Sequence, residues 1–157
     1  MKNMQNQNIR YRRIIPAVLI VLGLGCLSLS PAEQEGRDHS IVGLWKVHYF
    51  SGTVEIFQSF DQWHSDGQEF EVANLAPGAE CQGTFKQTGS AVQLFHVGWN
   101  FDQNGALTGY FKETQALTVG QEGHTYRGTW DIKNYDVNGN FLNEDKGTLH
   151  ATRLTLH

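Results

Sequence analysis

The chain has 157 residues, of which 39% are hydrophobic and 18% charged, and its formal net charge is −4. This length suggests a single domain with a substantial core, and the apolar fraction argues against a disordered chain. Residues 1–32 hold four basic residues and no acidic one, so the rest of the chain holds 8 basic and 16 acidic residues, a net charge of −8. A body of this charge repels phosphate backbones, so we expect no nucleic-acid partner.

Residues 1–32 contain the three parts of a secretory signal. A basic stretch comes first, an apolar stretch covers residues 14–29, and Ser30-Pro31-Ala32 supplies small residues for cleavage. We therefore expect a cleaved signal peptide and a protein exported to the periplasm or the exterior. The alternatives are a retained membrane anchor over residues 14–30 and lipidation of Cys26. In either case the N-terminal segment would be the only attachment to a membrane. All three place the body outside the cytoplasm.

The segment that follows, residues 33–40, is polar and contains glycine, so we expect a flexible lead-in to the domain. Cleavage after Ala32 would leave Cys81 as the only cysteine, and the domain would then have no internal disulfide. A lone cysteine of this kind is most often a small, buried apolar residue. Stability must then come from packing.

Turn signals recur at regular intervals from residue 41 onward, and seven breaks delimit eight segments. The segments are rich in Thr, Val and aromatic residues and alternate between polar and apolar positions, as half-buried antiparallel strands do. We therefore predict an all-β domain over residues 41–157, an eight-stranded antiparallel up-and-down barrel that is either filled or holds one small ligand. The predicted strands cover residues 41–50, 53–64, 68–74, 81–87, 91–101, 106–118, 124–135 and 141–156.

Two features at opposite ends of this domain resemble the lipocalins and their wider calycin relatives. Gly43-Leu44-Trp45 matches the G-x-W of the first strand, and Arg153 stands where the last strand of those proteins supplies an arginine. The resemblance implies a lipocalin-like barrel in which Arg153 packs over Trp45 and closes one end, both residues being structural. The T-D-Y-like motif, the helix after the barrel and the disulfide of typical members are not evident.

A closer resemblance is to a group of small, exported, mostly bacterial proteins. They share a stretch like Trp63-His64-Ser65-Asp66-Gly67, a stretch like that from Cys81 to Gly89 with Gly83 and Phe85 inside it, and a strand carrying His96 before an Asn-Gly turn. This resemblance spans most of residues 43–153. It implies a fold rather than an activity.

His96 is the residue that the pattern singles out for chemistry. It shares a strand face with Val92 and Leu94, so a lumenal His96 would need a polar partner or cost about 1–3 kcal/mol. Glu113 and Glu71 are the carboxylates best placed to meet it. A satisfied core histidine and a ligand-orienting or acid–base histidine both fit this position.

Ligand contacts are expected at a barrel mouth and along the lumen. Asp66-Gly67 predicts a hairpin, which would place the preceding histidine at a mouth. Aromatic residues of the strands provide either a stacking surface for a ligand or cross-strand core pairs. The candidate ligand-binding residues are Trp63, His64, His96, Trp99 and Tyr110.

Neither a metal nor a cofactor is expected from the spacing of the candidate ligands. His48, His64, His96 and His150 lie on four separate predicted strands, and no H-x-H, H-E-x-x-H or C-x-x-C motif occurs. The chain also has no glycine-rich phosphate loop and no serine nucleophile elbow.

The leading hypothesis is an exported lipocalin-like barrel that binds a small, partly apolar molecule in its lumen. An alternative is a calycin-type isomerase, cyclase or decarboxylase in which His96 acts as general acid–base and Glu113 orients it. A third reading is a filled barrel that serves as a structural component of the envelope.

Overall fold

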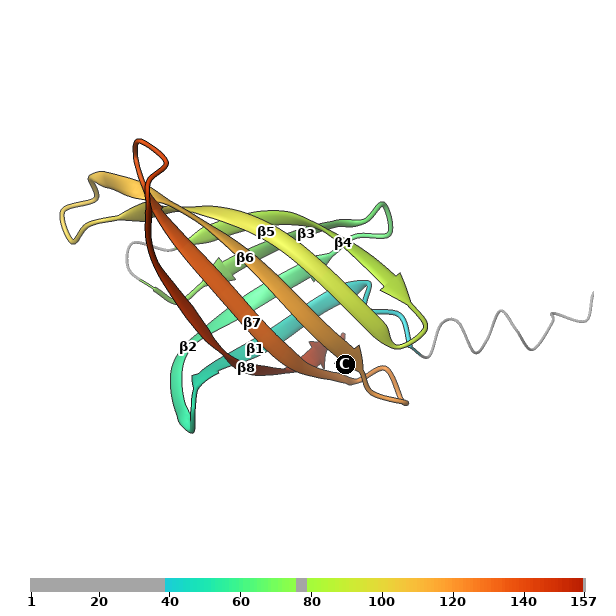
Figure 1. The fold of residues 1–157 in the computed structure, drawn as a ribbon. Helices are drawn as coiled ribbons and strands as arrows, with labels where there is room; N and C mark the ends of the chain where they lie inside the picture. Colours follow the sequence, from blue (N-terminus) through green and yellow to red (C-terminus); the bar gives the residue numbers. More distant parts are fainter. Residues whose placement is uncertain (1–38, 76–78, 157) are drawn as a thin grey trace, which may run out of the picture.

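The computed structural model describes residues 39–75 and 79–156, which form a closed barrel of eight antiparallel strands (Figure 1). The strands are β1 (Gly43–Ser51), β2 (Val54–Trp63), β3 (Gln68–Ala73), β4 (Glu80–Thr88), β5 (Ala91–Phe101), β6 (Leu107–Val119), β7 (Thr125–Asp136) and β8 (Phe141–Leu154). The predicted all-β barrel and its strand order are confirmed. The expected signal peptide or anchor, with Cys26, and most of the expected lead-in lie outside the described residues.

Each strand pairs with its neighbours in sequence, and β8 pairs with β1 to close the sheet, for example through Trp45 opposite Arg153. Glycines with positive φ occupy the tight turns, as Gly67 does after β2 and Gly105 after β5. Only glycine adopts this backbone conformation at little cost, which explains why the chain reverses at these points. Within the described ranges, no helix is long and apolar enough to cross a membrane.

Arg153 packs over Trp45 at one end of the barrel, which we call the closed end. The guanidinium carbon of Arg153 lies 4.1 Å from the centroid of the Trp45 ring. Its Nε donates to the carbonyl of Gly123 at 2.6 Å and its Nη1 to that of Val42 at 2.7 Å, while Nη2 donates to Ser40. Arg153 therefore ties the segment before β1 and the β6–β7 turn to the last strand.

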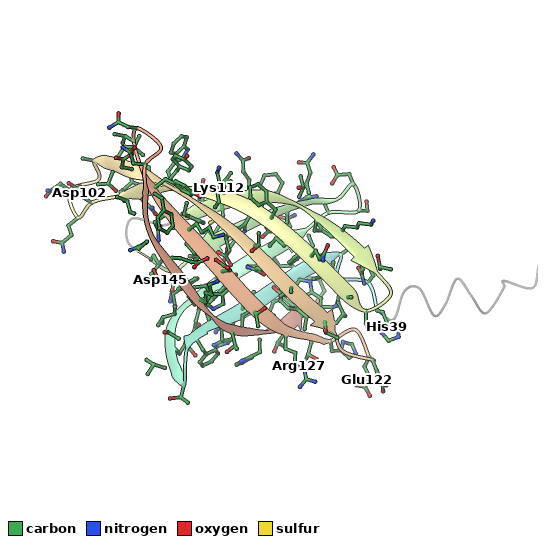
Figure 2. The ribbon with its side chains drawn as sticks, in the orientation of Figure 1. His39, Asp102, Lys112, Glu122, Arg127 and Asp145 are labelled. Carbon is green, nitrogen blue, oxygen red and sulfur yellow. The ribbon has the colours of Figure 1, made fainter. Side chains whose placement is uncertain are left out.

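The opposite end carries the β1–β2, β5–β6 and β7–β8 turns together with the end of β3 and the start of β4. Figure 2 shows Asp102, in the β5–β6 turn, at this end and Glu122, in the β6–β7 turn, at the closed end. We call the end that carries Asp102 the open end.

The apolar core lies in the half of the barrel next to the closed end. Trp45 is fully buried, its indole donates to the Ile41 carbonyl at 2.7 Å, and its ring meets that of Tyr126 edge-on at 4.8 Å. Trp63 packs against Phe85 and the same tyrosine. Aromatic and aliphatic side chains thus fill this half, and side-chain alternation along each strand sends the intervening residues outward.

Candidate functional site

A layer of polar side chains crosses the interior beside this apolar core. Each of its members is buried, with at most 3% of the residue exposed. The layer consists of Ser59, Asp61, Glu69, Glu71, His96, Glu113 and Gln115. Four carboxyl groups and one imidazole therefore share a space from which water is largely excluded, and such groups are retained in proteins only when they have partners or a function.

Strand register brings the members of this layer together. His96 on β5 lies directly opposite Glu113 on β6 and opposite Gly83 on β4, and Gly83 in turn lies opposite Glu69 on β3. Because Gly83 has no side chain, Glu69 reaches His96 across the position of an entire strand. The neighbouring row places Glu71 opposite Asp61 on one side and Cys81 on the other.

The imidazole of His96 is surrounded by carboxylates on both sides. Its Nε2 lies 2.8 Å from Glu113 Oε2, at ion-pair distance, although the ring N–H is not aimed squarely at that oxygen. Its Nδ1 lies 3.3 Å from Glu69 Oε2 and 3.7 Å from Glu71 Oε2. The two carboxylates that the sequence favoured for this histidine, Glu113 and Glu71, are both within reach, and Glu69 joins them.

Hydrogen bonds extend the layer to neighbouring strands. Gln115 Nε2 donates to Glu113 Oε1 at 2.7 Å and to the Tyr49 hydroxyl at 3.0 Å. On the opposite wall, the Tyr126 hydroxyl donates to Asp61 Oδ2 at 2.6 Å and Ser59 Oγ donates to Asp61 Oδ1 at 2.7 Å. These contacts satisfy part of the layer and hold Glu113 and Asp61 in place.

Burial governs the ionisation of the layer. Loss of hydration raises the pKa of Glu71 to about 7 and also raises the pKa values of Asp61 and Glu69. Burial on its own lowers the pKa of His96, but the charges of Glu113, Glu69 and Glu71 outweigh it and hold this pKa well above its ordinary value. The arrangement is therefore an imidazolium among carboxyl groups that retain protons more readily than they would in water.

Gly83 sets the space in which the imidazole lies. A Cβ at this position would be 2.4 Å from His96 Cβ and 2.4 Å from the Phe95 carbonyl oxygen, so the strands would have to shift. We expect Gly83→Ala to destabilise the protein by about 1–3 kcal/mol and to displace the His96 resonances in NMR spectra. The matched control is Gln82→Ala, on the exposed face of the same strand. Equal urea midpoints for the two variants would contradict this account of Gly83.

A cavity of about 400 Å³ opens beside the polar layer. Glu71, Cys81 and Glu113 contribute to its lining, and residues next to the open-end turns form its rim. Its apolar and aromatic lining includes Phe57, Ala73, Phe111, Trp130 and Ile132. The volume falls within the range of sites for small molecules, and the mixture of an apolar wall with a few polar groups is typical of them.

Several oxygens of the layer have no hydrogen-bond partner although they are buried. They are Glu69 Oε1, Glu71 Oε1 and Gln115 Oε1. No lysine or arginine of the described residues is among the buried side chains, so His96 is the one basic group there. With its carboxyl groups ionised, the layer therefore has more hydrogen-bond acceptors and more negative charge than its own donors satisfy.

One group of side chains has the composition of a metal site. Donor atoms of Glu71, Cys81 and His96 lie within 4.8 Å of one another. Both ring nitrogens of His96 already face carboxylate oxygens, so an ion would have to displace one of those contacts. Burial also raises the pKa of the Cys81 thiol, which keeps it in the form that binds metals poorly.

The five residues expected to line one ligand site do not converge. Trp63 is buried in the core near the closed end, and His64 lies in the β2–β3 turn there, edge-on to Phe70. Trp99 is 61% exposed and packs edge-on against Tyr110, because alternation turns both outward from the face that carries His96 and Glu113. An outer hollow of about 520 Å³ includes both aromatics, and the edge of Trp99 also reaches the rim of the interior cavity.

Other members of the site were not anticipated from the sequence. Glu69 and Asp61 contact the layer from β3 and β2, and Gln115 links it to Tyr49. A signal was present, since alternation places Glu69 on the same strand face as Glu71. The missing information was the register that sets Gly83 between Glu69 and His96.

Comparisons of the chain with protein-family models, with curated proteins and with solved structures find no match. The side chains of the interior are therefore the basis on which a function is proposed.

Proposed function

We propose that this barrel binds a small, partly apolar molecule in the cavity at its open end. The molecule's polar group would contact Glu71 and Glu113, and its apolar part would lie against the aromatic wall. The observation that carries the proposal is the cavity of about 400 Å³ lined by both carboxylates, Phe111 and Trp130. A barrel filled by its own side chains would leave no such space, so the cavity favours binding over a purely structural role.

Filling the cavity tests this proposal. Ala73 is 6% exposed and lines the cavity, so Ala73→Phe places an aromatic ring in the space meant for a ligand. With the neutral probe N-phenyl-1-naphthylamine, we expect saturable fluorescence enhancement that this variant weakens at least tenfold. Ala116→Phe, on the outer face of β6, should bind as the unaltered chain does. Equal probe binding by the two variants would place the probe elsewhere and contradict the proposal.

The proposal includes a lipocalin-like class and an exported location. The closed eight-stranded meander and the packing of Arg153 over Trp45 support the first. The basic, apolar and small-residue stretches of residues 1–32 support the second, with a membrane anchor as the alternative. The charge of the body supports a small-molecule partner over a nucleic acid.

A second candidate function is enzymatic, and the contact of His96 Nε2 with Glu113 Oε2 at 2.8 Å favours it. His96 is fully buried and does not line the cavity, whereas Glu71 does. In an enzyme, Glu71 would therefore exchange a proton with the substrate, and His96 would be a positioning residue. Deuterium exchange at the methyl group of acetophenone, catalysed by the unaltered chain and lost in Glu71→Gln, would support this function.

A further inference from the structure

We infer that the ligand is a small organic cation, a protonated amine with an aromatic or aliphatic body, whose ammonium group binds at Glu71. This inference rests on the proposed function and names the chemical class of its ligand. It follows from the excess of buried hydrogen-bond acceptors and from the shortage of buried positive charge.

Buried oxygens without a hydrogen-bond partner favour a ligand that donates hydrogen bonds. Glu71 lines the cavity and its Oε1 has no partner, so a ligand there satisfies the ionised carboxylate only by donating. A carboxylate or phosphate ligand brings further acceptors and would leave this atom unpaired. An ammonium group offers up to three N–H donors and no acceptor, which matches the deficit.

The buried side chains also favour a ligand that carries a positive charge. Asp61, Glu69, Glu71 and Glu113 are buried together with a single base, His96. One imidazolium balances one carboxylate, so a second cation is needed before another carboxylate can ionise without a large loss of hydration. Asp145, which lines the cavity toward the open end, adds a further negative charge along the route of entry.

The cavity lining offers both a carboxyl group to the ligand's ammonium group and an apolar wall to the rest of the ligand. Of the four buried carboxyl groups, Glu71 and Glu113 line the cavity, whereas Asp61 and Glu69 do not. The side chains of Phe57, Phe111 and Trp130 form part of the wall. Aromatic faces attract cations and bury apolar groups, so an amine attached to an apolar skeleton fits both parts of the space.

Three probes that share one skeleton test the inference by calorimetry on the full-length chain. They are phenethylamine, 2-phenylethanol and phenylacetate, which are cationic, neutral and anionic at pH 7.5. We expect the amine to bind at least tenfold more tightly than the alcohol and the acid not to bind measurably. This order of affinities is read on the unaltered protein and does not depend on the folding of any variant.

A matched pair of variants tests whether Glu71 causes the preference for the amine over the alcohol. Glu71→Gln should weaken phenethylamine binding roughly tenfold or more and leave the affinity for 2-phenylethanol within about twofold. Glu122→Gln removes the same charge from the exposed β6–β7 turn at the closed end and should change neither affinity. Equal loss in both variants would mean that overall charge, not Glu71, attracts the amine, and would overturn the inference.

The remaining outcomes separate this inference from the proposed function. If the alcohol binds as tightly as the amine and Ala73→Phe blocks both, the cavity binds ligands but does not select cations, and only the inference fails. If no probe binds in a manner sensitive to Ala73→Phe, the proposed function fails with it. If ZnCl₂ binds instead of the amine, and Cys81→Ser abolishes that binding, the site is a metal site and the inference is overturned.

Discussion

Replacing Glu71 with glutamine should make the protein more stable at pH 8 by about 3 kcal/mol and reduce its loss of stability between pH 5 and pH 8. Burial raises the pKa of Glu71 from 4.5 to about 7. Below pH 4.5 the group is protonated in both the folded and the unfolded chain, so it costs nothing. As the pH rises to 7, the unfolded chain ionises first, and the free energy of unfolding falls by about 1.4 kcal/mol per pH unit.

The other shifts of the layer act in the same direction. The raised pKa values of Asp61 and Glu69 also remove stability as the pH rises. The raised pKa of His96 adds stability that is complete below pH 6.5 and declines as the pH rises further. The titratable side chains around Glu71 come from all of β1 to β7: Tyr49, Asp61, Glu69, Cys81, His96, Glu113 and Tyr126.

Thermal unfolding followed by circular dichroism measures this effect. The unaltered chain should melt about 10 °C lower at pH 8 than at pH 5, and Glu71→Gln should show a clearly smaller difference, because the shifts of Asp61, Glu69 and His96 remain. Glu122→Gln, which removes an exposed carboxylate, should retain the full pH dependence. A Glu71→Gln protein that melts lower than the unaltered chain at pH 8 would show that the ionised carboxylate stabilises the fold.

The second large effect is expected at the closed end. Trp45→Ala should cost about 3–5 kcal/mol because the ring is fully buried, donates to Ile41 and packs against both Tyr126 and Arg153. A domain of this size is stable by about 5–15 kcal/mol in total, so the variant should be close to unfolding at room temperature.

Urea denaturation of Trp45→Ala and Trp99→Ala compares the loss of stability when the same type of residue is removed from a buried and from an exposed position. Trp99 is 61% exposed on the outer face, so its removal should cost less than about 1 kcal/mol. Similar midpoints for the two variants would mean that the closed end does not depend on the Trp45 ring and would contradict the role given to it.

Most of the fold could be predicted because its signals are local. Alternation identified all eight strands, and the glycine-containing turns marked where they end; six of the observed turns contain a glycine with positive φ at the position expected. The last strand ends earlier than predicted, at Leu154, because β1 provides partners for β8 only as far as its own start near Gly43. Trp45 and Arg153 stand opposite each other through that same pairing.

The site was harder to predict because it depends on register across strands that are distant in sequence. Glu113 could be paired with His96, since the two strands are joined by one short turn. The approach of Glu69 depends on the absence of a side chain at Gly83, which no local pattern reveals. Trp99 was expected beside a ligand. Side-chain alternation along β5 instead places it on the face opposite to that of His96, so it points outward.

The most direct test of the account is to titrate Glu71 itself by carboxyl ¹³C NMR, with its signal assigned from the Glu71→Gln spectrum. In the free protein its ionisation midpoint should lie near pH 7, as burial beside Glu69 and Glu113 requires. Saturating phenethylamine should move the midpoint down by at least one pH unit, because an ammonium group stabilises the carboxylate. A midpoint near pH 4.5 that the amine leaves unchanged would contradict both the raised pKa of the buried Glu71 and the binding of a cation to it.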